Sequence, residues 1–260
     1  MASNSLGRST VASGYASSSF GYKTEASGGV SVAFGSGTKA TGGEGSFVFG
    51  KVSEATGSSS FSGGFGSIAS GQTAVSIGYY NKSLGAASFS VGSLNEAQTD
   101  YSIAAGSDNI SSGFAAVTFG FMNTTSGQQA FSVGTGNTAS GNQSIAIGSG
   151  NISSGIVSTA LGSSTTSTGK YATSAGKGTI SSGFGTMAIG TYNIENSSDS
   201  AELYDASNTE FVIGNGADND NRSDAFVVKF DGTTTIAGDL NINSDAKLKA
   251  NIISLGSTLA

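Results

Sequence analysis

The sequence predicts an all-β protein, in which a solenoid of 14-residue coils is followed by a second β-structured segment. Two observations predict this class: glycines recur at a fixed spacing through residues 1–190, and a short run of alternating large and small residues precedes most of them. A spacing held over many repeats is typical of coils that stack on one another. The Gly- and Ser-rich composition alone would permit disorder, but a disordered chain has no reason to keep this register.

Two glycine series define the repeat. The first falls at Gly7, Gly21, Gly35, Gly50, Gly64, Gly78, Gly92, Gly106, Gly120, Gly134, Gly148, Gly162, Gly176 and Gly190. The second falls at Gly14, Gly28, Gly42, Gly57, Gly71, Gly85, Gly113, Gly127, Gly141, Gly155, Gly169 and Gly183, with Thr99 in place of one member. Every step is 14 residues except one step of 15 in each series, from Gly35 to Gly50 and from Gly42 to Gly57. One inserted residue within 43–46 explains both exceptions.

The residues before the first glycine series predict a short strand in each coil. Ile145-Ala146-Ile147-Gly148 shows the pattern of large, small and large residues before glycine, which is the period of a strand with one packed face. We interpret the large Phe, Ile and Val rows as the solenoid core. The small Ser and Ala rows then form a flat face that packs against another copy in a closed homo-oligomer. Each coil has two short strands and two tight turns, and both glycine series supply positive φ angles.

The composition excludes several function classes. The 260 residues contain no His, Cys, Pro or Trp, which excludes Ser-His-Asp and Cys-His triads, ordinary zinc sites and disulfides. We therefore expect no enzymatic activity, no cofactor and no metal site. No apolar run is long enough for a membrane-spanning helix, and the start does not resemble a secretory signal, so we expect no membrane insertion. Neither part of the chain has the basic stripe that a nucleic-acid site needs.

The charge balance changes near residue 190. Residues 1–190 hold seven basic and six acidic residues, whereas residues 191–260 hold four basic and eleven acidic residues, which together give the net charge of −6. We divide the chain there and expect a neck over residues 191–243 with strands at 210–214, 225–230 and 233–236. Within it, Asp218, Asp220 and Asp224 alternate as in a calcium loop, but the closing Glu is missing and a solvated turn is favoured.

The repeat resembles the head repeat of trimeric autotransporter adhesins. The units that carry the resemblance are Val32-Ala33-Phe34-Gly35 with Ala40-Thr41-Gly42, and Ser144-Ile145-Ala146-Ile147-Gly148 with Ser154-Gly155. The resemblance covers residues 1–190. It implies a left-handed parallel β-roll, three chains wound into one homotrimer, and an adhesive rod.

The segment Asn243-Ser244-Asp245-Ala246-Lys247-Leu248-Lys249 resembles the start of the C-terminal intramolecular chaperone of phage tailspikes and tail fibres. The resemblance implies self-cleavage between Ser244 and Asp245 after trimerisation, with Ser244 as nucleophile and Lys249 as base. Lys247 stands where that family has Arg, and only sixteen residues follow Ser244. Residues 244–260 are therefore interpreted as a truncated chaperone-like segment that opens with a short helix capped by Ser244 or Asp245.

Aromatic and apolar residues that directly follow two glycines of the first series are candidate receptor contacts. They are Tyr79, Tyr80, Phe121 and Met122. Apolar residues on turns mark a binding surface or cover the edge of a neighbouring chain, and both readings stay open.

These features predict a structural, receptor-binding trimer rather than an enzyme. Our first hypothesis is a phage or phage-like tail fibre, located on the virion tail, that binds a host cell-surface glycan or protein and joins other fibre or baseplate proteins. The alternative is an adhesin on the surface of a bacterial cell. An ice-binding solenoid is a remote alternative, because the Thr residues do not form a ladder on one face.

Overall fold

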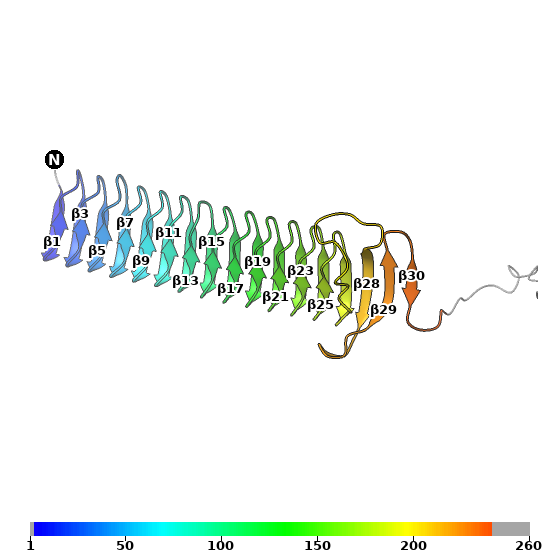
Figure 1. Cartoon of the computed structure of the whole chain (residues 1–260). Helices are drawn as coiled ribbons and strands as arrows, with labels where there is room; N and C mark the ends of the chain where they lie inside the picture. Colours follow the sequence, from blue (N-terminus) through cyan, green and yellow to red (C-terminus); the bar gives the residue numbers. More distant parts are fainter. Residues whose placement is uncertain (1–2, 241–260) are drawn as a thin grey trace, which may run out of the picture.

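The computed structural model describes residues 3–240, and Figure 1 shows them as one row of stacked coils that ends in three further strands. The described residues form strands, turns and loops without a helix. Consequently none of them forms a helix of the length and apolarity that crossing a membrane demands. The predicted all-β parallel solenoid is confirmed.

Each coil contributes one long and one short strand. The long strands are β1 (Asn4–Arg8), β3 (Ser18–Tyr22), β5 (Val32–Ser36), β7 (Phe47–Lys51), β9 (Phe61–Phe65), β11 (Val75–Tyr79), β13 (Phe89–Ser93), β15 (Ile103–Ser107), β17 (Val117–Phe121), β19 (Phe131–Thr135), β21 (Ile145–Ser149), β23 (Thr159–Ser163), β25 (Thr173–Lys177) and β27 (Met187–Thr191). The short strands are β2 (Val11–Ala12), β4 (Glu25–Ala26), β6 (Lys39–Ala40), β8 (Glu54–Ala55), β10 (Ile68–Ala69), β12 (Lys82–Ser83), β14 (Glu96–Ala97), β16 (Ile110–Ser111), β18 (Thr124–Thr125), β20 (Thr138–Ala139), β22 (Ile152–Ser153), β24 (Thr166–Ser167) and β26 (Ile180–Ser181).

Equivalent strands of successive coils pair in parallel, so the long strands form one sheet and the short strands another. Glycines of the first series face each other across the long-strand sheet, as Gly134 faces Gly148. The register step is 15 residues where Gly35 faces Gly50 and where Lys39 faces Glu54, so one inserted residue shifts both sheets, as the sequence predicted. The insertion lies in the following turn, where the positive-φ residue is Gly45, three residues after Gly42 instead of two.

The burial pattern corrects our interpretation of the core. The small residues of the long strands point inward, and Ala33, Ser132 and Ala146 are fully buried. The large residues point outward instead: Phe34 is 59% exposed and Ile147 is 38% exposed. Alternation predicts two faces but not which one is inside. The physical reason is that a 14-residue coil with two turns encloses too narrow a space for Phe or Ile side chains.

The second glycine series also has a different role from the one predicted. The first series does take positive φ angles, for example 120° at Gly134. Gly141 of the second series does not, but a Cβ there would overlap the carbonyl oxygen of Gly155 in the next coil. The left-handed positions come two residues later and are mostly not glycine, as at Gln143 and Val157, both with φ of 58°. The second series therefore permits close stacking rather than reversal of the chain.

The neck continues the long-strand sheet. β28 (Thr209–Asn215) pairs in parallel with β27, β29 (Asp224–Lys229) pairs antiparallel with β28, and β30 (Thr234–Ile236) pairs antiparallel with β29. The three strands expected in the neck are thus confirmed to within one or two residues. Ser244, Asp245 and Lys249 lie outside the described residues, so the chaperone-like segment stays a prediction, as do the boundary at residue 190 and the left-handed coil.

Candidate binding surfaces

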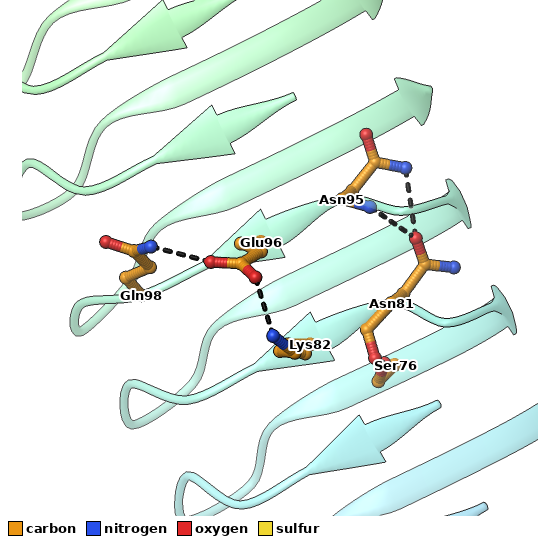
Figure 2. Close-up of polar contacts among 6 residues, drawn as sticks. All are labelled: Ser76, Asn81, Lys82, Asn95, Glu96 and Gln98. Atoms are coloured by element: carbon orange, nitrogen blue, oxygen red, sulfur yellow. Dashed lines mark hydrogen bonds and ion pairs between the residues drawn. The ribbon is translucent and has the colours of Figure 1, made fainter. Parts of the chain in front are cut away.

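The interior of the roll contains a ladder of buried asparagines that sequence reasoning missed. Six of them recur at 14-residue intervals, three residues after the first glycine series, and all are at most 1% exposed: Asn81, Asn95, Asn109, Asn123, Asn137 and Asn151. Figure 2 shows one rung, in which the Asn81 Oδ1 atom accepts hydrogen bonds from the backbone N and the Nδ2 of Asn95 at 2.9 and 3.1 Å. The ladder satisfies polar backbone groups of the turn that water does not reach.

The side chains in the middle of the ladder bridge three coils, as Asn109 shows. The Nδ2 of Asn109 donates to Asn95 Oδ1 at 3.0 Å, to the carbonyl oxygen of Ala105 at 3.0 Å and to that of Gly120 at 2.7 Å. Its Oδ1 accepts from the Asn123 backbone N at 3.1 Å. The ladder therefore holds the turn between long and short strands in a fixed position along the rod.

The outer face of the long-strand sheet is largely apolar. Its two rows consist of the residues one and three positions before the first-series glycines, most of which are large and apolar, among them Phe47, Phe49, Phe61 and Ile147. The rings of Phe47 and Phe61 stack with centroids 5.3 Å apart. Phe49 folds over Gly63, where a Cβ would overlap its ring. An apolar surface of this extent marks an interaction site.

The four predicted receptor contacts lie on the turn after the long strands, and all are exposed. The exposed fractions are 51% for Tyr79, 45% for Tyr80, 46% for Phe121 and 58% for Met122. The structure brings Tyr79 and Tyr80 together in an edge contact with centroids 4.7 Å apart, and Phe65 contacts both rings. Phe121 and Met122 lie three coils further along, so the four residues do not form one site.

A groove runs beside Tyr80 on the short-strand side of the roll. It has a volume of about 490 Å³ and includes Val52, Ile68, Lys82 and Leu94 in its walls. Sequence reasoning missed it because it is formed by two rows of side chains from successive coils. The sequence nevertheless contains a pattern that could have predicted the groove, because bulky residues spaced 14 apart lie side by side in successive coils.

Ion pairs between adjacent coils border the groove. Lys82 Nζ lies 2.7 Å from Glu96 Oε1, and Lys39 Nζ lies 3.1 Å from Glu54 Oε1. Gln98 Nε2 donates to the other oxygen of Glu96 at 2.7 Å, as Figure 2 shows. The hydrogen bonds from Lys82 and Gln98 lower the pKa of Glu96 below its ordinary value. Glu96 is consequently ionised at neutral pH, and Lys82 and Gln98 hold its two oxygens in place.

The acidic loop of the neck is a turn anchored to the roll by Arg222. The Oδ1 of Asp218 accepts from the Nδ2 of Asn221 at 2.8 Å and from the backbone N of Asn221 and of Asp220 at 2.9 and 3.0 Å, and these hydrogen bonds lower the pKa of Asp218. Arg222 donates to the carbonyl oxygens of Gly178 and Asn193 at 2.8 and 3.0 Å. The loop thus has the solvated-turn structure that we favoured.

The junction between roll and neck forms a small, partly open cavity. It has a volume of about 210 Å³, and its lining includes Glu195, Asp199, Asp224 and Lys229. Burial raises the pKa of Asp224, whose Oδ1 accepts from the backbone N of Ile194 at 2.9 Å. Within residues 3–240 no three acidic side chains come together in a way that would ligate a metal ion.

Comparison with known proteins supports the predicted resemblance of the repeats. A family model described as the YadA head domain repeat matches two segments, residues 12–38 and 126–151. Both segments lie within the roll and contain complete turns between its strands. No curated protein matches the chain. The chain therefore carries adhesin-type head repeats on a parallel β-solenoid.

Proposed function

We propose that the chain is the adhesive head of a trimeric surface adhesin, a stiff rod that displays binding surfaces away from a bacterial cell. The observation that carries the proposal is the apolar outer face of the long-strand sheet, on a roll whose repeats match an adhesin head. The family match favours this function over the phage tail fibre of our first hypothesis. The tail-fibre interpretation depends on residues 243–252, outside the described residues.

In this proposal the apolar face is the contact between the three chains. Full burial of an Ile or Phe side chain is worth roughly 1.5–3 kcal/mol, so covering the 38% of Ile147 that is exposed contributes about 0.5–1 kcal/mol. Similar residues follow in both rows along the whole roll. Their sum exceeds the free energy lost when three chains associate, which is roughly 4–15 kcal/mol per association step.

A pair of substitutions in one coil tests the trimer. Ile147 lies on the long-strand face and is 38% exposed, and Ile152 lies on the short-strand face and is 44% exposed. We expect light scattering to give three times the chain mass of 25.5 kDa for the wild type and for Ile152→Asp. Ile147→Asp should dissociate the trimer, because it places three buried charges near one another. A monomeric wild type, or an unaffected Ile147→Asp trimer, would contradict the proposal.

Cell binding separates the adhesin from the tail fibre. Labelled trimer should bind cultured animal cells if it is an adhesin head, and three chains on one rod should raise its avidity above that of a single site. Retention by bacterial cells alone would favour the tail-fibre interpretation. Intact-mass measurement of a chain that includes residues 244–260 tests the predicted self-cleavage at Ser244.

A further inference from the structure

We propose that the groove beside Tyr80 binds pyranose rings of a neutral glycan. The proposal deepens the adhesive function above and rests on it, because it names the class of ligand that the rod would hold. It does not depend on the trimer contact, since the groove opens on the short-strand side. Its length follows from three coil steps of roughly 4.8 Å, which gives about 15 Å, or two to three sugar rings.

One wall of the groove is a row of apolar residues in the left-handed conformation. Val52, Tyr80 and Leu94 belong to this row, with φ angles of 55°, 51° and 57°. Gly66 interrupts the row between Val52 and Tyr80 and leaves room for the Tyr80 ring. A Cβ on Gly66 would overlap that ring, so the ring lies directly over the glycine. The Tyr80 ring therefore takes the space of the side chain that Gly66 lacks.

The orientation of Tyr80 is fixed before any ligand binds. Its ring lies edge-on to Phe65 at 5.3 Å and edge-on to Tyr79 at 4.7 Å, and Phe65 and Tyr79 stack on each other at 5.6 Å. Lys51 lies 5.5 Å from the Phe65 ring centroid. A preformed aromatic surface loses little conformational entropy on binding.

The opposite wall consists of short-strand residues, three of them charged and one apolar. Glu54, Ile68, Lys82 and Glu96 follow one another at the same position of successive coils. The apolar side chain of Ile68 lies between the charged residues Glu54 and Lys82. The carboxylates and the ammonium group offer hydrogen-bond acceptors and donors along the rim of the groove.

This combination matches a pyranose ring better than other ligands. A pyranose has an apolar face of C–H groups and a rim of hydroxyls, and the groove pairs an apolar wall with a rim of charged acceptors and donors. The rim is electrically balanced, because Glu54 is paired with Lys39 and Glu96 with Lys82. Balanced charge gives no advantage to a strongly anionic or cationic ligand.

The sheet topology disfavours a peptide strand as the occupant. The short strand β10, which carries Ile68, is paired on one side with β8 and on the other with β12. An added strand needs a free sheet edge to form a main-chain ladder. The groove runs across paired strands and offers no such edge.

The groove is a local feature of the roll. Three coils beyond Tyr80, the equivalent left-handed position is Met122, followed by Gly136 and Gly150 in the next two coils, so the bulky row ends there. The short-strand row also changes, from charged residues to Thr124 and Thr138. Phe121 and Met122 therefore stay outside the proposed glycan site.

The test measures binding of three neutral trisaccharides (maltotriose, mannotriose and chitotriose) to the purified protein by calorimetry and by saturation-transfer NMR. We expect at least one to bind with a Kd on the order of 1 mM per site. Tyr80→Asn should weaken that binding at least tenfold, and Gly66→Asn should do the same by displacing the Tyr80 ring. Asn tolerates the left-handed conformation at both positions.

Tyr101→Asn is the matched control. Tyr101 is also an exposed tyrosine in the left-handed conformation, with φ of 60°, but it lies on the opposite turn of the coil. It should leave binding unchanged. Absence of binding by all three sugars at about 10 mM, or binding that survives Tyr80→Asn, would overturn the proposal.

Mass and stability measurements distinguish the two proposals. If Tyr80→Asn dissociates the trimer or lowers its melting temperature far more than Tyr101→Asn, the groove is a subunit contact and the glycan site is refuted. If the wild type is monomeric but binds a trisaccharide through Tyr80, the trimeric function fails and the site stands. Binding of a peptide instead of a sugar would also overturn the assignment.

Discussion

Replacing Asn109 by Ala should destabilise the rod far more than removal of a single surface amide. Asn109 is fully buried, and its side chain makes hydrogen bonds to the coils on both sides. With Ala in its place, the backbone N–H of Asn123 loses its acceptor. The carbonyl oxygens of Ala105 and Gly120 each lose a donor.

The magnitude follows from these losses. A buried N–H left without a partner costs about 1–3 kcal/mol, and each of the other two lost hydrogen bonds contributes roughly 0.5–1.5 kcal/mol. We therefore expect the free energy of unfolding to fall by about 2–6 kcal/mol per chain. Asn109→Ser should cost less, because a hydroxyl at this position can accept the next N–H, as Ser53 Oγ accepts from Ser67 N at 3.3 Å.

Guanidinium unfolding followed by circular dichroism measures these values. The protomer concentration is kept fixed, because the proposed association would make stability depend on it. Asn142→Ala is the control: Asn142 is exposed, and its Oδ1 accepts one long hydrogen bond from the Gln128 backbone N at 3.3 Å. It should change stability by less than about 0.5 kcal/mol. If Asn109→Ala and Asn142→Ala cost the same, the ladder has no stabilising role and the reasoning fails.

Three further predictions concern the turns and the surface. Gly134→Ala should prevent folding, because its Cβ would overlap a glycine carbonyl of the next coil, whereas Gly136→Ala, with open space around it, should cost only about 1–2 kcal/mol in a melting experiment. Val157→Gly should raise the melting temperature, because it relieves a β-branched residue at φ 58°; a lower value would contradict this. The lowered pKa of Glu96 means that its bond to Lys82 stabilises the fold above its ordinary pKa and is lost as pH falls through the lowered value. In an acid titration, the stabilities of wild type and Glu96→Gln should therefore converge as the pH falls below the lowered pKa of Glu96, and parallel curves would refute the prediction.

Much of the fold could be predicted because the repeat is strict. The glycine spacing alone gave the coil length, the strand positions and the single insertion, and Gly35 does face Gly50 across the sheet. Such a register follows from backbone geometry, since a glycine in one coil needs a glycine above it to allow the close approach. The exposed positions of Tyr79 and Met122 were predicted for the same reason, although their role as receptor contacts stays a prediction.

The inside and the outside of the coil could not be predicted from alternation. Ala146 and Ile147 are neighbours on one strand, and a period of two fits equally well with either residue buried. Hydrophobicity favoured Ile147 as the core residue. The width of the space between the two sheets determines which of the two residues is buried. That width depends on coil length and turn geometry rather than on the hydrophobicity of one side chain. The asparagine ladder was missed because a polar residue recurring on a turn usually indicates solvent exposure.

The inverted packing links stability to assembly. Most side chains inside the roll are Ala, Ser, Thr and Asn, so an isolated chain buries little of its large apolar surface and depends on hydrogen bonds between coils. The residues that would form the core of an ordinary β protein, such as Phe34, Phe61 and Ile147, instead remain for a second surface to cover. Because burial of apolar area is the main favourable contribution to folding, the roll would gain a further part of that contribution in the proposed trimer, where another chain covers its long-strand face. Among substitutions on this face such as Ile147→Asp, those that lower the trimer fraction more should therefore also lower the melting temperature more.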